Sequence, residues 1–167
     1  MTSHSNAAIA PIALQPGEGD ARWFLGSLIT IKSTADATGG GPSVTENYSP
    51  RGGGSPLHVH HNEDEWFYVM EGELTFWVGG EVTVAPAGSF VYGPRGIPHT
   101  FLVSSDEARF LLVAEPGGFE GFVRALSVPA GELTLPPESV VPPSPETMMA
   151  VAAEYSLEIV GPPGIPE

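Results

Sequence analysis

The sequence predicts an all-β fold of the sandwich or barrel type, followed by short C-terminal helices. Glycine (21 residues) and proline (18 residues) are both abundant in the 167-residue chain, which indicates many turns and short elements and not a helical bundle. Short runs of β-branched and aromatic residues recur through the middle of the chain, and turn residues separate them. The length suits one domain with a substantial hydrophobic core.

Several of the expected strands alternate between apolar and polar residues. In the run LTFWV, Leu74, Phe76 and Val78 share one face, as the period of two along a strand requires. Turn signals such as Gly79-Gly80 lie between the runs. The most strand-like segments are residues 28–32, 74–78, 81–85, 89–93, 99–103 and 109–114. Closely spaced strands with tight turns favour a β-sandwich or a β-barrel.

The character of the sequence divides the chain into three segments. Residues 1–20 are small and polar and are expected to form a flexible lead-in, and residues 21–118 are expected to form the barrel. Residues 119–167 read as a helical and irregular extension that packs on the barrel or on a partner subunit. Within it, the run 119–127 has apolar residues at helical spacing. A second short helix is predicted over residues 145–155, with Ser144 as its N-cap.

Charge and cysteine content exclude several classes of partner and site. Six basic and 20 acidic residues give a formal charge of −14, so the surface repels nucleic acids and anionic membranes. The chain has no cysteine, so a metal site must use histidine and carboxylate ligands. No secretory signal and no apolar run of about 18 residues stands out, which predicts a soluble, cytoplasmic protein.

A cluster of histidines carries the clearest chemical signal. His58 and His60 point to the same face of an extended strand, about 7 Å apart. The loop 61–64 can reverse the chain, which places Glu65 at the start of the next strand beside them, and His99 begins a later strand. Three imidazoles and one carboxylate suit one divalent transition metal per chain, and the ligand types leave Fe, Mn, Co, Ni, Cu and Zn open.

These residues resemble the two motifs of the cupin superfamily, a double-stranded β-helix (jelly-roll) fold. The first motif is matched in every spacing by Gly52, His58-Val59-His60, Glu65 and Gly72. The second is matched by Gly88, Pro94-Arg95-Gly96 and His99, whereas Val103 replaces its final asparagine, which is not a ligand in the family. The resemblance implies a jelly-roll barrel in which His58, His60, Glu65 and His99 bind the metal.

A narrower resemblance concerns the segment after the barrel. Residues 115–137 (EPGGFEGFVRALSVPAGELTLPP) look like the region that follows the barrel in bacterial quercetin 2,3-dioxygenase-type cupins. Those enzymes use O2 to open the central ring of a flavonol, and their ligand glutamate also serves as a base. The resemblance implies an oxygenase that acts on an aromatic or polyketide-type small molecule, with Glu65 as the catalytic base.

Aromatic residues are expected to form the core and, in part, the wall of a substrate pocket. Phe67, Phe76 and Phe101 are the candidates for this wall, and Tyr48 is a candidate for the pocket mouth. An apolar pocket beside a metal suits a planar aromatic substrate. The sequence also predicts core positions for Phe90 and Tyr92.

The remaining charged residues of the motif loop have a simpler interpretation. His61 faces away from His60 along an extended chain and is expected to be solvated, and Glu63 and Asp64 are expected to be exposed loop acids. Three functions stay open: an oxygenase, a metal-dependent isomerase, cyclase or lyase that needs no O2, and a small-molecule-binding protein without turnover. A homodimer is the expected assembly.

Overall fold

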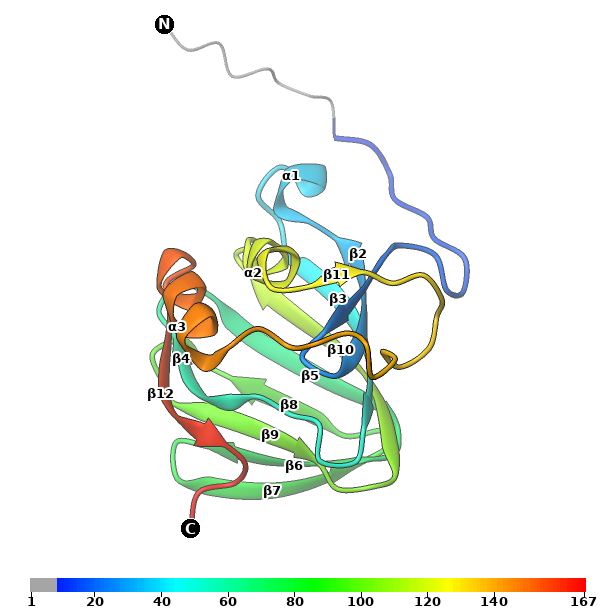
Figure 1. Cartoon of the computed structure of the whole chain (residues 1–167). Coiled ribbons are helices and arrows are strands. Elements are labelled where there is room, and N and C mark those ends of the chain that lie inside the picture. The colour runs from blue at the N-terminus through cyan, green and yellow to red at the C-terminus, as the bar shows by residue number, and fades with distance from the viewer. Residues whose placement is uncertain (1–8) are drawn as a thin grey trace, which may run out of the picture.

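The computed structural model describes residues 9–167 and folds them into two antiparallel sheets that face each other (Figure 1). The larger sheet contains, in spatial order, β11 (Val128–Pro129), β1 (Asp20–Phe24), β2 (Ser27–Ser33), β3 (Ser43–Pro50), β10 (Glu107–Glu115), β5 (Asp64–Glu71) and β8 (Phe90–Gly93). The smaller sheet contains β12 (Leu157–Pro163), β4 (Pro56–His60), β9 (His99–Val103), β6 (Glu73–Val78) and β7 (Glu81–Pro86). The predicted all-β fold is confirmed. Residues 1–8 of the expected lead-in lie outside the described residues.

Three short helices accompany the sheets in the described part of the chain: α1 (Ala35–Thr38), α2 (Phe119–Ala125) and α3 (Pro145–Glu154). The predicted cap of α3 is present, because the Thr147 backbone N–H donates to the Ser144 hydroxyl at 3.1 Å. Pro145 occupies the first turn, where its missing N–H is tolerated. Within residues 9–167, no helix has the length and apolar character that crossing a membrane requires.

The main core lies between the two sheets and is built by strand alternation. On β10 every second residue is buried, which turns Ala108, Phe110, Leu112 and Ala114 inward. The complete cluster is Phe67, Val69, Leu74, Phe76, Ala85, Val103, Ala108, Phe110, Leu112 and Ala114. Burial of each large side chain of this set contributes about 1.5–3 kcal/mol to folding.

The expectation that Phe90 and Tyr92 belong to the core is wrong. Both are exposed, by 63% and 45% respectively. The register explains this, because Tyr92 pairs with Trp66 and Phe90 pairs with Tyr68 across the β5–β8 ladder. Trp66 and Tyr68 are the outward residues of β5, so their partners on β8 also face outward.

The turn between β5 and β6 explains one glycine of the motif. Gly72 has a φ of +77°, and a Cβ at this position would lie 2.2 Å from the Glu107 carbonyl oxygen. Only glycine combines this backbone conformation with such a close approach. The turn therefore fixes the register of the strand that begins at Asp64 and carries Glu65 near its start.

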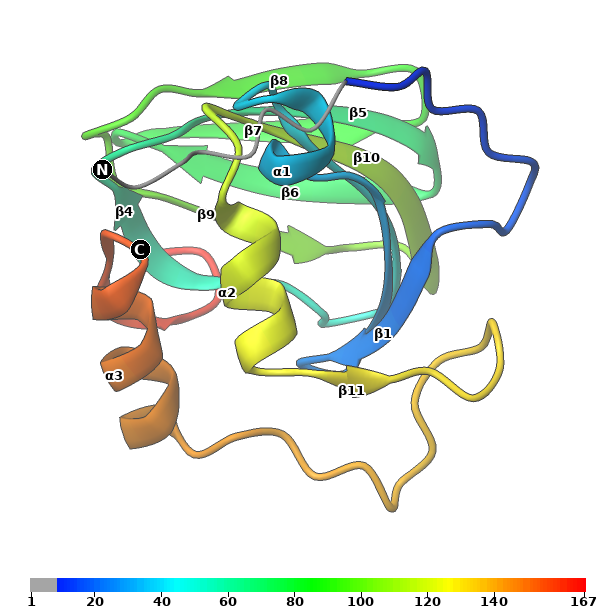
Figure 2. The same cartoon turned by 90° about the horizontal axis from the view of Figure 1, so that it is seen from above.

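The C-terminal segment closes one end of the barrel. β12 pairs with β4, with Leu157 opposite His60 and Ile159 opposite His58, so it adds an edge strand beside the histidines. Helix α2 lies over the space between the two sheets, and α3 lies beside it (Figure 2). A second apolar cluster joins these elements to β1 and β2: Phe24, Ile29, Ile31, Phe122, Val123, Leu126, Ala152 and Leu157.

Candidate metal centre

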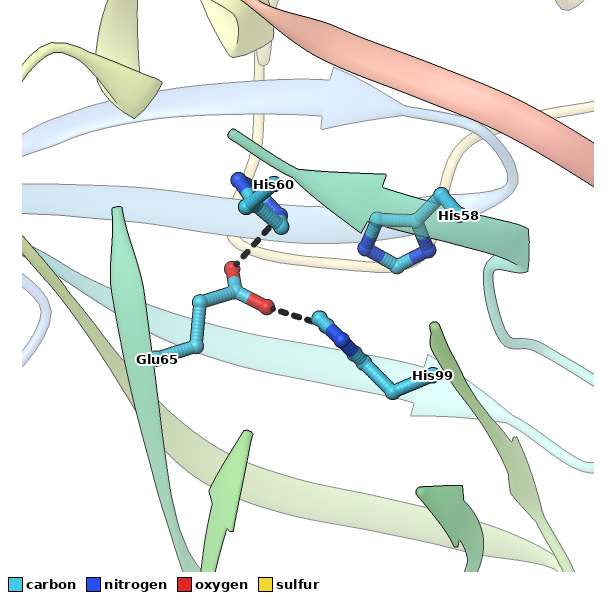
Figure 3. Close-up of side chains that lie close together, drawn as sticks. All are labelled: His58, His60, Glu65 and His99. Atoms are coloured by element: carbon cyan, nitrogen blue, oxygen red, sulfur yellow. Dashed lines mark hydrogen bonds and ion pairs between the residues drawn. The ribbon is translucent and has the colours of Figure 1, made fainter. Parts of the chain in front are cut away.

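The structure brings His58, His60, Glu65 and His99 together at the interior of the barrel (Figure 3). One ligand atom from each lies within 4.8 Å of the others, and all four side chains are buried. His58 and His60 come from one face of β4, and His58 pairs with His99 on β9. Glu65 comes from β5 in the opposite sheet, so the cluster joins the two sheets.

An acceptor outside the cluster orients each imidazole. The Nδ1–H groups of His58 and His99 donate to the carbonyl oxygens of Pro56 (2.8 Å) and Ile97 (3.1 Å). A carbonyl oxygen only accepts, so the proton of each ring sits on Nδ1. The other nitrogen of His58, Nε2, then presents a lone pair to the centre, which is the arrangement that metal-binding histidines require.

Three buried side-chain atoms of the described residues lack a hydrogen-bond partner: Ser43 Oγ, and two atoms that face the centre. The two atoms at the centre are His60 Nε2 and Glu65 Oε1, which lie 3.4 Å apart without hydrogen-bond geometry. The other carboxylate oxygen, Glu65 Oε2, lies 2.8 Å from His99 Nε2. Buried polar atoms without partners destabilise a fold by about 1–3 kcal/mol each. A cation bound between them would satisfy both, so the residues present fit a metal ion.

Burial and mutual charge set the protonation of the cluster. Burial, together with the neighbouring His99 and His60, lowers the pKa of His58 to about 3. Burial also works to lower the pKa of His60, but the charge of Glu65 and the hydrogen bond to Glu63 raise it to about 10. Burial works to raise the pKa of Glu65, but His60 and His99 hold it well below its usual value. The site therefore provides a neutral His58 and an ionised Glu65.

The loop acids differ from expectation. Glu63 is only 4% exposed, and its Oε2 lies 3.1 Å from His60 Nδ1, so the expectation that it is solvated is wrong. Asp64 belongs to β5 and accepts hydrogen bonds from the Arg95 guanidinium at 2.7 Å and from the Arg95 backbone N–H at 2.9 Å. His61 is exposed, as expected, and contacts Glu158 at 2.9 Å.

A largely apolar cavity adjoins the cluster, with His58 and Glu65 in its wall. The strands supply Phe24, Ile29, Phe101, Phe110, Leu112, Leu157 and Ile159, and the helices supply Phe119, Phe122 and Met148. None of these helical residues was predicted at the pocket, although the spacing of the run 119–127 indicated an apolar face. Phe119 also packs edge-on against the His60 ring, with centroids 5.5 Å apart.

Of the four aromatic residues expected at the pocket, Phe101 lines the cavity. Phe67 and Phe76 instead pack against each other in the core, with ring centroids 5.0 Å apart. Tyr48 lies outside the cavity, because it alternates with the buried inward residues of β3 and faces the other way. Its hydroxyl donates to Glu107, and the Arg109 guanidinium lies 4.1 Å from its ring centroid.

Comparison with known proteins agrees with this geometry. A family model described as a cupin domain matches residues 44–114, a stretch that contains all four clustered residues. Residues 44–114 are therefore a cupin domain. The two facing sheets are thus those of a cupin.

Among curated proteins, this cupin is 31% identical over 119 residues to quercetin 2,3-dioxygenase of Bacillus subtilis. The aligned residues cover 71% of this chain and 35% of that enzyme. It is 39% identical over 56 residues to an uncharacterized protein of Streptomyces coelicolor, which covers 34% of the chain and 53% of that protein. The chain thus spans about a third of the length of the first relative and about half of the length of the second.

A solved structure described as a predicted oxalate decarboxylase from Thermotoga maritima superimposes with a TM-score of 0.57 at 20% identity. The match covers 62% of this chain and 97% of that one, and it shows the shared fold.

Proposed function

We propose that this cupin is a metal-dependent oxygenase that resembles quercetin 2,3-dioxygenase and acts on an aromatic or polyketide-type small molecule. The observation that carries the proposal is the buried set of three histidines and one glutamate at the wall of an apolar cavity. The similarity to the Bacillus subtilis enzyme supports the reaction class. The donor set suits Fe, Mn, Co, Ni, Cu or Zn.

A divalent transition metal held by His58, His60, Glu65 and His99 would supply Lewis-acid and redox chemistry at the cavity wall. The protein's own contribution begins with orientation, because each imidazole is fixed by its Nδ1 contact. Glu65 is ionised and borders the cavity, and its Oε1 has no hydrogen-bond partner among residues 9–167. Glu65 is therefore the group that would take the proton of a bound substrate hydroxyl.

The cavity wall selects the kind of substrate. Aromatic rings from both the barrel and helix α2 surround it, including Phe101, Phe110, Phe119 and Phe122. Such a wall favours flat apolar molecules and keeps bulk water away from the reacting groups. A hydroxylated aromatic compound meets both requirements, since its ring packs on the wall and its oxygen reaches the charged end.

The test is oxygen consumption by protein reconstituted separately with each of the six metals. We expect at least one metal form to consume O2 in proportion to the loss of a flavonol such as quercetin. The same incubation without O2 is the control. Turnover that persists without O2 would assign an isomerase, cyclase or lyase, and tight flavonol binding with no product would assign a binding protein. Absence of uptake with every metal would contradict the proposal.

We also propose that the cupin forms a homodimer. Apolar side chains gather on the outward faces of the edge strands β8 and β7 and of β5: Tyr68, Val82, Val84, Phe90 and Tyr92, each at least 45% exposed. Exposed apolar residues on edge strands favour association. Light scattering after size-exclusion chromatography measures the mass directly, and a monomer across the micromolar range would contradict this assembly.

A further inference from the structure

The inward face of β3 is polar along its whole length. Ser43, Thr45, Asn47 and Ser49 alternate along the strand, and each is at most 4% exposed. The neighbouring strand β10 presents apolar residues at the same levels, with Phe110 opposite Asn47. A buried polar row inside an apolar barrel is costly unless each polar atom has a partner.

Most of the row is satisfied by contacts within the protein. The exceptions are Ser43 Oγ, which has no hydrogen-bond partner among residues 9–167 and does not border the cavity, and Asn47 Oδ1. The hydroxyls of Ser49 and Ser27 lie 2.8 Å apart. Asn47 Nδ2 donates to the Thr45 hydroxyl at 3.0 Å and to the Thr45 carbonyl oxygen at 3.3 Å. Because a backbone carbonyl only accepts, the amide nitrogen must face Thr45, which fixes the orientation of the Asn47 amide. Within residues 9–167, no group donates to Asn47 Oδ1, although the side chain is 4% exposed.

This acceptor belongs to the same cavity as the metal centre. Ser27, Asn47 and Ser49 line that cavity together with His58 and Glu65. The pairing of β5, β10 and β3 gives the separation between Glu65 and Asn47 along the strand direction. Glu65 on β5 is opposite Ala114 on β10, and Ala114 is opposite Ser43 on β3. Asn47 lies four residues further along β3, which corresponds to about 13 Å. The cavity thus has a charged end at the cluster and a polar, uncharged group far from it.

We propose that Asn47 and the Ser27–Ser49 hydroxyl pair form a subsite that binds a hydroxyl group at the far end of an elongated aromatic substrate. The inference rests on the proposed function and narrows its substrate class to hydroxylated multi-ring compounds. The substrate hydroxyl donates to Asn47 Oδ1, and the serine pair holds the same oxygen or its neighbour. A single-ring phenol anchored at the metal end is too short to reach this group.

Matched flavonols test the subsite. The probes are 3-hydroxyflavone and its derivatives with one further hydroxyl at either outer ring, the 7 or the 4′ position. Their binding to the metal-loaded protein without O2 is followed by the change in flavonol absorbance. We expect one derivative to bind about tenfold more tightly than 3-hydroxyflavone, the size of one hydrogen bond in a dry site. Asn47→Leu should abolish this preference and leave the metal content unchanged.

Two further variants keep the test decisive. Ser49→Ala is a small change that tests the same subsite if Asn47→Leu does not fold, and it should reduce the preference. Tyr48→Phe, on the opposite face of β3, is the control and should leave the preference intact. Equal affinities for all three flavonols in the wild type, or a preference that survives both Asn47→Leu and Ser49→Ala, overturns the inference.

Oxygen consumption in the same samples separates this inference from the proposed function. Consumption of O2 with 3-hydroxyflavone and no preference among the derivatives would overturn the subsite and leave the oxygenase in place. A preference lost in Asn47→Leu without any consumption of O2 would support the subsite and overturn the oxygenase. Absence of binding by all three probes would overturn the subsite.

Discussion

Glu63 holds His60 through a buried contact, with Glu63 Oε2 3.1 Å from His60 Nδ1 and the two side chains 5% and 1% exposed. The other two histidines of the cluster use backbone carbonyl oxygens for the same purpose. A backbone acceptor cannot be removed by substitution, whereas a side-chain acceptor can. His60 is thus the candidate ligand whose orientation can be tested by mutating its partner.

Substitution of Glu63 should weaken metal binding without removing a ligand. Loss of the outer partner of a metal-bound histidine lowers metal affinity by about 10–100-fold. We expect a loss of this size for Glu63→Leu and a smaller one for Glu63→Gln, whose amide oxygen can still accept from Nδ1. Competition with a chromophoric chelator measures the affinity. Glu158→Gln, which alters the exposed partner of His61, is the control, and unchanged affinity in Glu63→Leu would exclude this positioning role.

Neighbouring histidines provide a matched pair for the metal site itself. His60→Ala should abolish binding of the metal, because it removes a ligand and leaves a buried charge uncompensated. His61→Ala should retain about one metal ion per chain, since His61 is exposed and contacts Glu158. Elemental analysis of protein purified without a histidine tag measures both. Equal metal content in the two variants would contradict the assignment of the cluster.

A surface ion pair should give stability a specific dependence on pH. Hydrogen bonds from the Arg95 guanidinium and from the Arg95 backbone lower the pKa of Asp64 from 3.8 to about 2. Because the folded-state pKa lies below the unfolded one, the stabilisation is complete above about pH 4 and is lost as the pH falls toward 2. Asp64→Asn should therefore destabilise the protein at neutral pH and match the wild type near pH 2.

Urea denaturation at several pH values measures this effect. Asp106→Asn is the control, because Asp106 pairs with Arg51 through a side chain that is 95% exposed. A constant difference between Asp64→Asn and the wild type from neutral to acidic pH would contradict the role of ionised Asp64. The pair also connects β5 to the turn that precedes β9, so it links the two strands that carry Glu65 and His99.

Spacing in the sequence was sufficient to find the four clustered residues, because strand alternation fixes the face of His58 and His60. The spacing did not reveal that Glu63 is buried, because an acid in a short loop is usually solvated. The path of the turn alone brings Glu63 next to His60. Strand β12 was also missed. It has few β-branched residues and ends in prolines, and pairing with β4 outweighs its weak local preference.

Alternation gives the face of a residue but not its depth in the barrel. Phe76 and Phe101 are opposite one another on β6 and β9, yet Phe76 is 1% exposed and Phe101 borders the cavity. Phe76→Ala should therefore cost about 3–5 kcal/mol of stability, as for other buried phenylalanines. Phe101→Ala should cost less, because its ring already borders open space, and it should weaken flavonol binding. Urea denaturation and flavonol titration of both variants measure this division, and equal losses of stability would contradict it.

Glu65→Gln separates the two roles assigned to one side chain. The amide keeps the shape of the carboxylate and one oxygen ligand, so three histidines and that oxygen should still bind the metal, although less tightly. The variant cannot accept the substrate proton, and loss of a general base lowers turnover by about 10²–10⁴-fold. We expect this loss in kcat for metal-saturated protein, with the flavonol affinity little changed. Glu63→Gln, saturated with the same metal, is the control, because its carboxylate contacts His60 but does not line the cavity. If Glu65→Gln keeps full turnover once saturated, another group must take the proton, and Glu65 is a ligand alone.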